Sequence, residues 1–154
     1  MENTVLKPES YAQIKKLNPN AVLPTKGSPL AVGYDLHACM DSTKLITPHS
    51  TVKIGTGLII IPPQGYFAGV FPRSGLSVNK GLRLANCVGA IDPDYRGELI
   101  VAIHNDWDKA RIIAPGDRIA QLIFLPYAEN VKFNEVDALD DTIRGTGGFG
   151  STGK

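Results

Sequence analysis

The sequence has few cysteines and no long apolar run. Only two of its 154 residues are cysteine, and Cys39 and Cys87 stand far apart without a CxxC pair, which argues against a zinc site or a disulfide framework. Both are expected to be ordinary buried or half-buried residues. Apolar stretches such as 57–63 and 119–126 are well short of the roughly 20 residues that a membrane helix needs. No membrane span is therefore predicted.

The chain also has almost no net charge. Its 16 basic and 15 acidic side chains leave a formal charge of +1, too little for the broad positive field that gathers nucleic acid or an anionic membrane. Direct nucleic-acid binding is not expected, and phosphate chemistry must come from local clusters. The first ten residues, MENTVLKPES, lack the apolar core of a secretory signal. An intracellular, soluble protein in cytoplasm or nucleus is expected.

Glycine and proline are abundant, at 16 and 11 residues, and are spread along the chain. Between them lie short bursts rich in Val, Ile and aromatic residues, at 52–61, 66–71, 98–104, 110–113 and 119–127. Such bursts predict many short strands and an all-β jelly-roll-like sandwich or barrel. Residues 99–103 are apolar throughout and predict a strand buried on both faces. Helical periodicity is weak, with candidates only at 10–17 and in a turn at 74–80.

The composition changes after residue 127. The stretch 128–142 is acidic, and 144–154 is almost entirely Gly, Ser and Thr with one apolar side chain, Phe149. Such a segment cannot hold itself folded, so 1–127 is expected to be the core and 128–154 a C-terminal extension. Residues 148–154 resemble a phosphate loop but lack the following helix. Glycine amides with Arg144 and Phe149 suit a lid over a nucleotide; the alternative is a tail without function.

Three further clusters are candidates for chemistry. Residues 72–76 place a basic and a hydroxyl residue before a glycine, and 116–121 place a polar Gln121 inside an apolar strand. In residues 89–97, Asp92 and Asp94 point the same way if the segment is extended. Two close carboxylates suit general-base work or metal binding, and a polar hairpin end is the alternative. The residues alone do not choose between the two aspartates.

Five ordered segments, 31–36, 72–76, 89–97, 116–123 and 144–153, together resemble the motifs of the trimeric, all-β dUTPase family. The resemblance implies a homotrimer that hydrolyses dUTP to dUMP and pyrophosphate with Mg²⁺, limiting uracil in DNA and supplying dUMP for dTTP synthesis. It also implies active sites shared between subunits. The first, second and fourth motifs would come from one chain, the third from a neighbour, and the fifth would be the closing arm of the remaining chain.

The same resemblance assigns residue roles. Asp92 would be the base that activates water for attack on the α-phosphorus, and Tyr95 would lie against the deoxyribose and exclude a 2′-hydroxyl. Asp35 would sit in the outer shell of the metal, which the triphosphate and waters would chiefly hold. The remaining substrate-binding residues would be Arg73, Ser74, Gly75 and Gln121 at the phosphates, Asn86, Gly89 and Ile91 at the uracil hairpin, and Arg144, Phe149, Gly150, Ser151 and Thr152 in the arm.

Two other function classes are open to the sequence. The related dCTP deaminase branch needs a glutamate general acid and base, and Glu98 lies on the wrong side of Tyr95 for the expected register. A non-enzymatic binding module is the second, and the intact motif set argues against it. Trp107 is expected at a loop tip and has no assigned role.

Overall fold

The structure is a computed structural model that describes residues 10–148. Within this range the chain forms twelve strands and one short helix. In chain order these are β1 (Gln13–Lys16), β2 (Thr25–Lys26), β3 (Tyr34–His37), β4 (Lys44–Ile46), β5 (Thr51–Gly55), β6 (Leu58–Ile61), β7 (Tyr66–Phe71), α1 (Ser74–Lys80), β8 (Leu82–Leu84), β9 (Gly89–Ile91), β10 (Ile100–Asn105), β11 (Arg111–Ile113) and β12 (Arg118–Pro126). The expected all-β class is confirmed.

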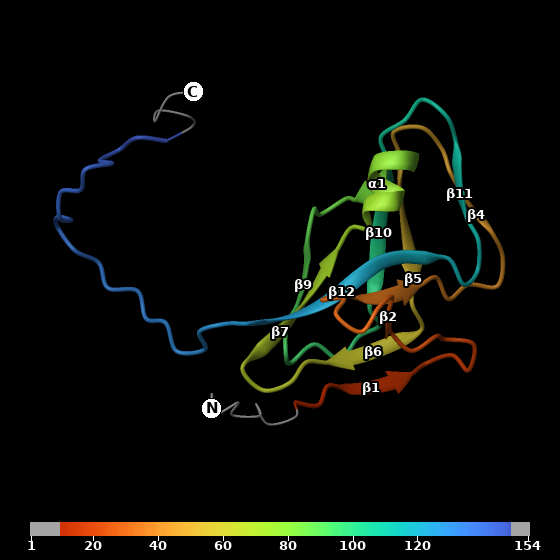
Figure 1. The fold of residues 1–154 in the computed structure, drawn as a ribbon, viewed down its shortest axis with the longest axis horizontal. Coiled ribbons are helices and arrows are strands. Elements are labelled where there is room, and N and C mark those ends of the chain that lie inside the picture. The colour runs from red at the N-terminus through yellow and green to blue at the C-terminus, as the bar shows by residue number, and fades with distance from the viewer. Residues whose placement is uncertain (1–9, 149–154) are drawn as a thin grey trace, which may run out of the picture.

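The strands form four hydrogen-bonded sheets in a jelly-roll-like arrangement (Figure 1). The largest has the order β2-β3-β12-β7-β9, and a second has the order β5-β10-β8. Two-stranded sheets, β1-β6 and β11-β4, complete the body. Every pairing among these described strands is antiparallel, and none of the four sheets closes into a barrel.

The core lies between these sheets and is almost wholly aliphatic. Its side chains come from alternate positions of the strands, because successive residues of a strand face opposite sides. The largest fully buried members are Leu36, Ile46, Ile54, Leu58, Ile60, Leu82, Leu99, Val101, Ile103, Ile113, Ile119 and Leu122. This packing fixes β3, which carries Asp35, β12, which carries Gln121, and β7, which leads to Arg73.

Two expectations about individual segments were wrong. The strand at 99–103 is not buried on both faces: Leu99, Val101 and Ile103 are buried, but Ile100 is 48% exposed, because only one face of β10 packs on the core. Of the two weak helical candidates, 74–80 forms the helix α1, whereas 10–17 contains strand β1. Cys39 is half-buried as expected, but Cys87 is exposed, at a turn where its φ is 60°.

Helix α1 begins directly after Arg73, which is its N-cap residue. It ends at Gly81, whose φ of 65° lies in the left-handed region and whose N–H donates to the carbonyl of Leu76. Trp107 lies against Gly81, where a side chain would collide with the indole ring. Trp107 is 40% exposed in the loop between β10 and β11, as the sequence predicted.

No helix among the described residues is long and apolar enough to cross a membrane.

Candidate active site

Asp35, Arg73 and Arg118 form an ion-pair cluster at one end of the large sheet. Arg73 Nε donates to Asp35 Oδ1 at 2.9 Å, and Arg118 Nη1 donates to Asp35 Oδ2 at 3.2 Å. The Asp35 side chain is only 15% exposed. The two guanidinium groups compensate the negative charge of this largely buried carboxylate. Arg73 also donates through Nη1 to the carbonyl of Arg118 at 3.2 Å. These hydrogen bonds hold the guanidinium groups of Arg73 and Arg118 side by side, an arrangement suited to binding an anion.

Gln121 lies beside this cluster because β12 runs between β3 and β7. It is the register partner of both Asp35 and Phe71, and its Nε2 donates to the carbonyl of Pro72 at 3.0 Å. A side chain at Gly33 would collide with Gln121 Oε1, so the glycine leaves room for the Gln121 side chain in its present position. The polar interruption seen in the sequence therefore has a partner, and it links the first, second and fourth motifs.

The start of α1 adds two candidate phosphate-binding residues to the same corner. Ser74 and Gly75 are exposed, directly after Arg73, and the backbone turns there because Leu76 N–H and Ser77 N–H both donate to the Arg73 carbonyl at 3.0 Å. The structure thus brings together five of the residues assigned to phosphate or metal: Asp35, Arg73, Ser74, Gly75 and Gln121 lie on or next to elements that meet at one end of the sheet.

His37 lies near this cluster, although no motif in the sequence indicated it as a site residue. Burial lowers its pKa; Asp35 opposes this shift, and Arg118 and Arg73 add to it. Its Nδ1 is buried and has no hydrogen-bond partner among the described residues. The lowered pKa means that His37 is neutral at pH 7, so the cationic character of the corner comes from the two arginines.

The third motif forms a separate site on β9 and the turns beside it, which we call the hairpin segment, although β8 pairs with β10 and β9 pairs with β7. Gly89 pairs with Val70 and Ile91 pairs with Ala68, and a side chain at Gly89 would lie 3.3 Å from Asn86 Nδ2. A cavity of about 240 Å³ opens here, lined by Ala90, Ile91, Asp92, Tyr95, Glu98 and Ile100. Three of the assigned residues, Ile91, Asp92 and Tyr95, therefore line one cavity, and Ile91 gives it an apolar wall.

Asp92 and Tyr95 belong to one tight turn. Tyr95 N–H donates to the Asp92 carbonyl at 3.1 Å, and the Tyr95 hydroxyl donates to the Glu98 carbonyl at 3.1 Å. Tyr127, just after β12, lies near this turn: partial desolvation raises its pKa, and the carboxylates of Glu129, Asp94 and Asp92 raise it further. The turn is therefore at the Tyr127 end of β12.

The two halves of the candidate site lie at opposite ends of β7. Continuing the β9 register places Asp92 opposite Phe67, whereas Arg73 follows the other end of β7 at Phe71. Six residues of extended chain between Phe67 and Arg73 correspond to about 20 Å. Figure 1 shows the same relation, with α1 at the top of the body and the start of β7 at its lower left. A single chain does not bring Asp92 to Arg73.

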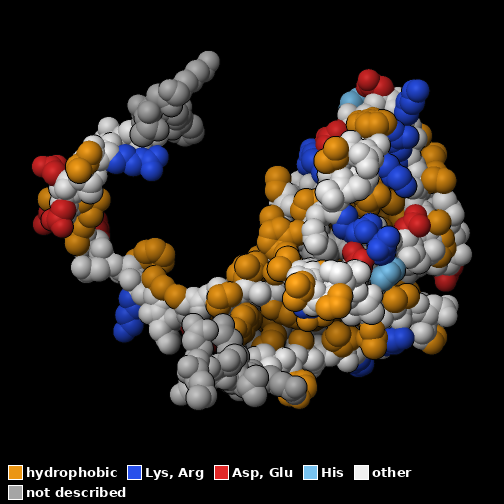
Figure 2. Space-filling model, in the orientation of Figure 1, with side chains coloured by type: hydrophobic (Ala, Val, Ile, Leu, Met, Phe, Trp, Pro, Cys, Tyr) orange, Lys and Arg blue, Asp and Glu red, His pale blue; other side chains and the backbone are white. Residues whose placement is uncertain are grey.

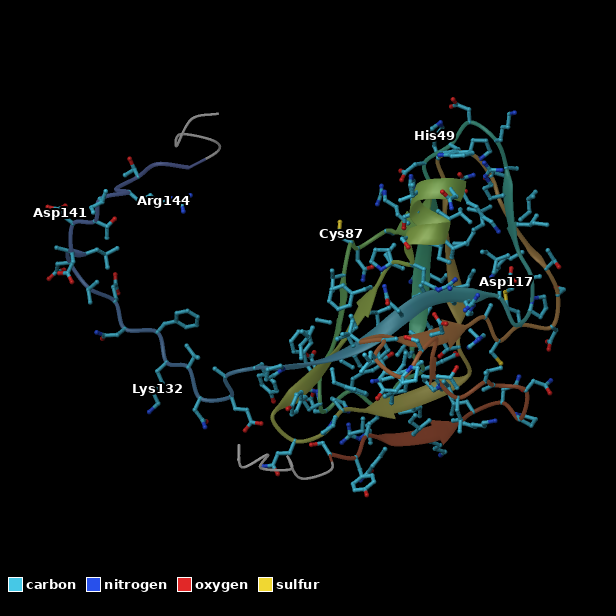
Figure 3. The ribbon with its side chains drawn as sticks, viewed as in Figure 1. His49, Cys87, Asp117, Lys132, Asp141 and Arg144 are labelled. Atoms are coloured by element: carbon cyan, nitrogen blue, oxygen red, sulfur yellow. The ribbon has the colours of Figure 1, made fainter. Side chains whose placement is uncertain are left out.

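The C-terminal residues assigned to the arm are only partly described. Arg144 is exposed, its Nε donates to the Gly147 carbonyl at 3.0 Å, and Figure 3 shows it on the extended segment away from the body. Phe149, Gly150, Ser151 and Thr152 lie outside the described residues, so their assignment stays a prediction.

No catalytic or substrate-binding role follows from the sequence for Arg118 or Glu98, but the sequence does suggest a carboxylate partner for Arg118, and in the structure that partner is Asp35. Arg118 follows a Pro-Gly-Asp turn, and a cation at the start of a strand that also carries Gln121 was the available signal. Glu98 was considered only as a deaminase acid. In the structure its Oε1 accepts a hydrogen bond from Gly57 N–H at 2.7 Å, a contact between residues 41 positions apart that no local pattern indicates.

Comparisons with known proteins agree on one family. The dUTPase family model matches residues 19–153. A deoxyuridine 5'-triphosphate nucleotidohydrolase of Syntrophotalea carbinolica is 44% identical over 141 residues, 92% of this chain and 95% of the relative. Another, from Desulfitobacterium hafniense, is 51% identical over 132 residues, 85% of this chain and 87% of the relative.

Solved structures give the same result for the fold. The dUTPase of Staphylococcus bacteriophage 80alpha, as a G164S mutant with dUpNHpp, superposes with a TM-score of 0.84 at 27% identity, covering 94% of this chain and 99% of that chain. The family model spans most of the present sequence, and the bacterial relatives share more than two fifths of their residues with it over nearly their full length. The chain belongs to the dUTPase family.

Proposed function

We propose that this protein is a dUTP diphosphatase that hydrolyses dUTP to dUMP and pyrophosphate, limiting uracil in DNA and supplying dUMP for dTTP synthesis. The observation that carries the proposal is the fixed cluster of Asp35, Arg73 and Gln121 in a member of the dUTPase family. The hairpin cavity that holds Asp92 and Tyr95 supplies the second half of the site.

The cationic corner binds the phosphates. Arg73 uses its Nε and Nη1 groups for contacts within the protein, which leaves the Nη2 donors of its planar fork available to phosphate oxygens. Arg118 places a second positive charge beside it. Ser74 and Gly75 contribute a hydroxyl and a backbone amide, and Gln121 a side-chain amide, to the α- and β-phosphates. Fixed donors of this kind stabilise charge as it develops on the phosphate.

Asp92 is the general base. It accepts a proton from a water molecule whose oxygen forms a bond to the α-phosphorus, while the bond from that phosphorus to the bridging oxygen breaks and pyrophosphate leaves. Asp94 is only two residues away, but Asp92 lines the cavity and Asp94 is not among its lining residues. General-base catalysis by a placed carboxylate contributes on the order of 10²–10⁴ in rate.

The residues fit a Mg²⁺ ion that is held mainly by substrate. The described residues contain no group of three or more His, Cys, Asp or Glu side chains suited to a metal, and both Asp35 oxygens are bound by arginines. Asp35 is therefore suited to orient metal-bound water from the outer shell. Magnesium commonly takes phosphate oxygens and waters as ligands, and when bound it would neutralise part of the triphosphate charge.

The separation of the two half-sites supports a homotrimer with shared active sites. Asp92 lies about 20 Å along β7 from Arg73 of its own chain, so the base must come from a second copy to reach a phosphate held by Arg73.

The segment after β12 also supports assembly of several copies. Its large apolar side chains are exposed: Val131, Phe133, Val136, Leu139 and Ile143. Figure 2 also shows hydrophobic side chains on the side of the body that faces this segment.

Substrate selection comes from the hairpin. Ile91 lines the cavity, and Gly89 lies two residues before it on β9. Together with Asn86 these are the residues expected to pair with uracil through main-chain groups, and cytosine would leave some of those groups unpaired. Tyr95 lies against the sugar and leaves no room for a 2′-hydroxyl. Glu98 does not favour a deaminase, because its carboxylate is bound to the backbone of Gly57.

The proposal is tested by incubating the purified protein with Mg²⁺ and, separately, dUTP, dTTP, dCTP or UTP. Pyrophosphate release and the identity of the nucleotide product are measured. Pyrophosphate and dUMP from dUTP, with little turnover of the others, is the expected result. A deoxyuridine product from dCTP would assign the protein to deamination instead, and no turnover by folded protein would support the binding module.

Phe149→Ala tests the proposed closing arm. Phe149 is expected to stack on the uracil, so its loss should raise the KM for dUTP and lower kcat, each by about tenfold, since aromatic stacking on a base contributes roughly 1–3 kcal/mol. Steady-state kinetics measure the effect, and sedimentation should show an unchanged assembly. Dissociation of the assembly, or unchanged kinetics, would contradict the arm assignment.

A further inference from the structure

The ring of Tyr95 is held by the residues that follow it. Its hydroxyl donates to the carbonyl of Glu98 at 3.1 Å, and the ring folds back over Gly97, where any side chain would collide with the phenol oxygen. Tyr95 is 43% exposed, so burial alone does not fix its ring. The hydroxyl contact and the missing side chain at Gly97 therefore set its direction.

Glu98 is in turn fixed to a distant part of the chain. Its Oε1 accepts a hydrogen bond of 2.7 Å from Gly57 N–H. Two glycines make this contact possible: a side chain at Gly55 would collide with the Glu98 carboxylate, and Gly57 has a φ of +68° with Cys39 and Ala21 packed against it. A hydrogen bond to a charged acceptor is stronger than one between neutral groups.

The residue after Glu98 is bound to the same turn between β5 and β6. Thr56, which is fully buried, donates to the Leu99 carbonyl through its Oγ1 at 2.8 Å and through its N–H at 3.2 Å. Leu99 N–H donates to the Leu58 carbonyl at 2.8 Å. The backbone at Glu98 therefore has little freedom, and the carbonyl that receives the Tyr95 hydroxyl stays in place.

We propose that Glu98 is a positioning residue that sets the selectivity of the enzyme for deoxyribose over ribose, acting through Tyr95. This inference rests on the proposed function. The Glu98 carboxylate anchors the segment on Gly57, its carbonyl fixes the phenol, and the fixed ring closes the cavity against a 2′-hydroxyl. Exclusion of a substrate by a ring requires that the ring cannot move aside. Glu98 also lines the cavity that holds Asp92 and Tyr95.

The test compares kcat/KM for dUTP and for UTP in the wild-type protein and in five variants, one of them a control. Glu98→Ala should lower the dUTP-to-UTP ratio about tenfold, as expected for loss of a hydrogen bond to a charged group. Glu98→Gln should restore most of the ratio, because its amide oxygen still accepts from Gly57 N–H. Tyr95→Phe should also lower the ratio, and Tyr95→Phe with Glu98→Ala should lower it no further than the larger single effect. Asp108→Ala, with an exposed acid in another loop, is the control.

The outcomes separate this proposal from the proposed function. Glu98→Ala that lowers kcat/KM for both nucleotides equally, leaving the ratio unchanged, would overturn the selectivity role and leave a structural one. Additive effects in the double variant would show that Glu98 does not act through Tyr95. If Glu98→Ala does not fold, an unchanged ratio in Tyr95→Phe overturns the proposal by itself. A wild-type protein that does not hydrolyse dUTP overturns both proposals.

Discussion

Replacing Asp92 with asparagine is expected to lower kcat for dUTP about a thousandfold, within the range that a general base contributes. The amide keeps the shape of the side chain but cannot take the proton of the attacking water. Asp92 lines the hairpin cavity with Tyr95 and Ile91, so the change removes the base without opening the cavity. Single-turnover kinetics with dUTP measure the chemical step directly, and KM should change little.

Asp94→Asn is the matched control for this variant. Asp94 has the same charge and lies two residues further along the same turn, but it does not line the cavity. The kcat of the Asp94→Asn variant is expected to stay within about threefold of wild type, because replacing an exposed side chain away from the reacting atoms has a small effect. The reverse result, a severe loss in Asp94→Asn with activity retained in Asp92→Asn, would move the base to Asp94.

Arg73→Ala should lower kcat/KM for dUTP by a factor of about 10²–10³, the effect of removing one fixed donor at a developing charge. The change removes the guanidinium expected at the phosphates and also one of the two cations bound to Asp35. Arg73→Lys should recover only part of the activity, because an ammonium has no planar fork to bind both the carboxylate and phosphate. Steady-state kinetics of the two variants give the comparison.

Arg96→Ala is the control for loss of another arginine from the five motifs. Arg96 is in the third motif but donates to the carbonyls of Pro93 and Tyr95, and within residues 10–148 it forms no ion pair with an acid. Its loss is expected to change kcat/KM less than fivefold. Equal losses in Arg73→Ala and Arg96→Ala would contradict a specific phosphate role for Arg73.

The strands were predictable because burial repeats locally. Short Val- and Ile-rich bursts separated by glycine and proline correctly placed β7, β10, β11 and β12. The prediction for Ile100 was wrong because an apolar strand sequence does not show whether both of its faces are covered. The tertiary arrangement covers only one face of β10 and leaves Ile100 48% exposed. The same holds for Cys87, whose exposure follows from the turn between β8 and β9.

The site was predictable only in part. Asp35 and Gln121 come from separate strands and Arg73 from the N-cap of α1, and the resemblance to the family, not their spacing, indicated that they meet. The structure shows that meeting through the bonds of Arg73 and Gln121. The contact of Glu98 with Gly57 could not be predicted, because it depends on a left-handed glycine and on a register between distant segments.

The central claim, that one active site uses Arg73 of one subunit and Asp92 of another, is tested most directly by mixed trimers. Arg73→Ala and Asp92→Asn chains carrying different affinity tags are co-expressed and purified over both tags. In a trimer of either mixed composition, one site pairs an intact Arg73 with an intact Asp92, so about one third of the wild-type dUTP hydrolysis should return. Mixed trimers as inactive as the two parent variants would contradict the claim.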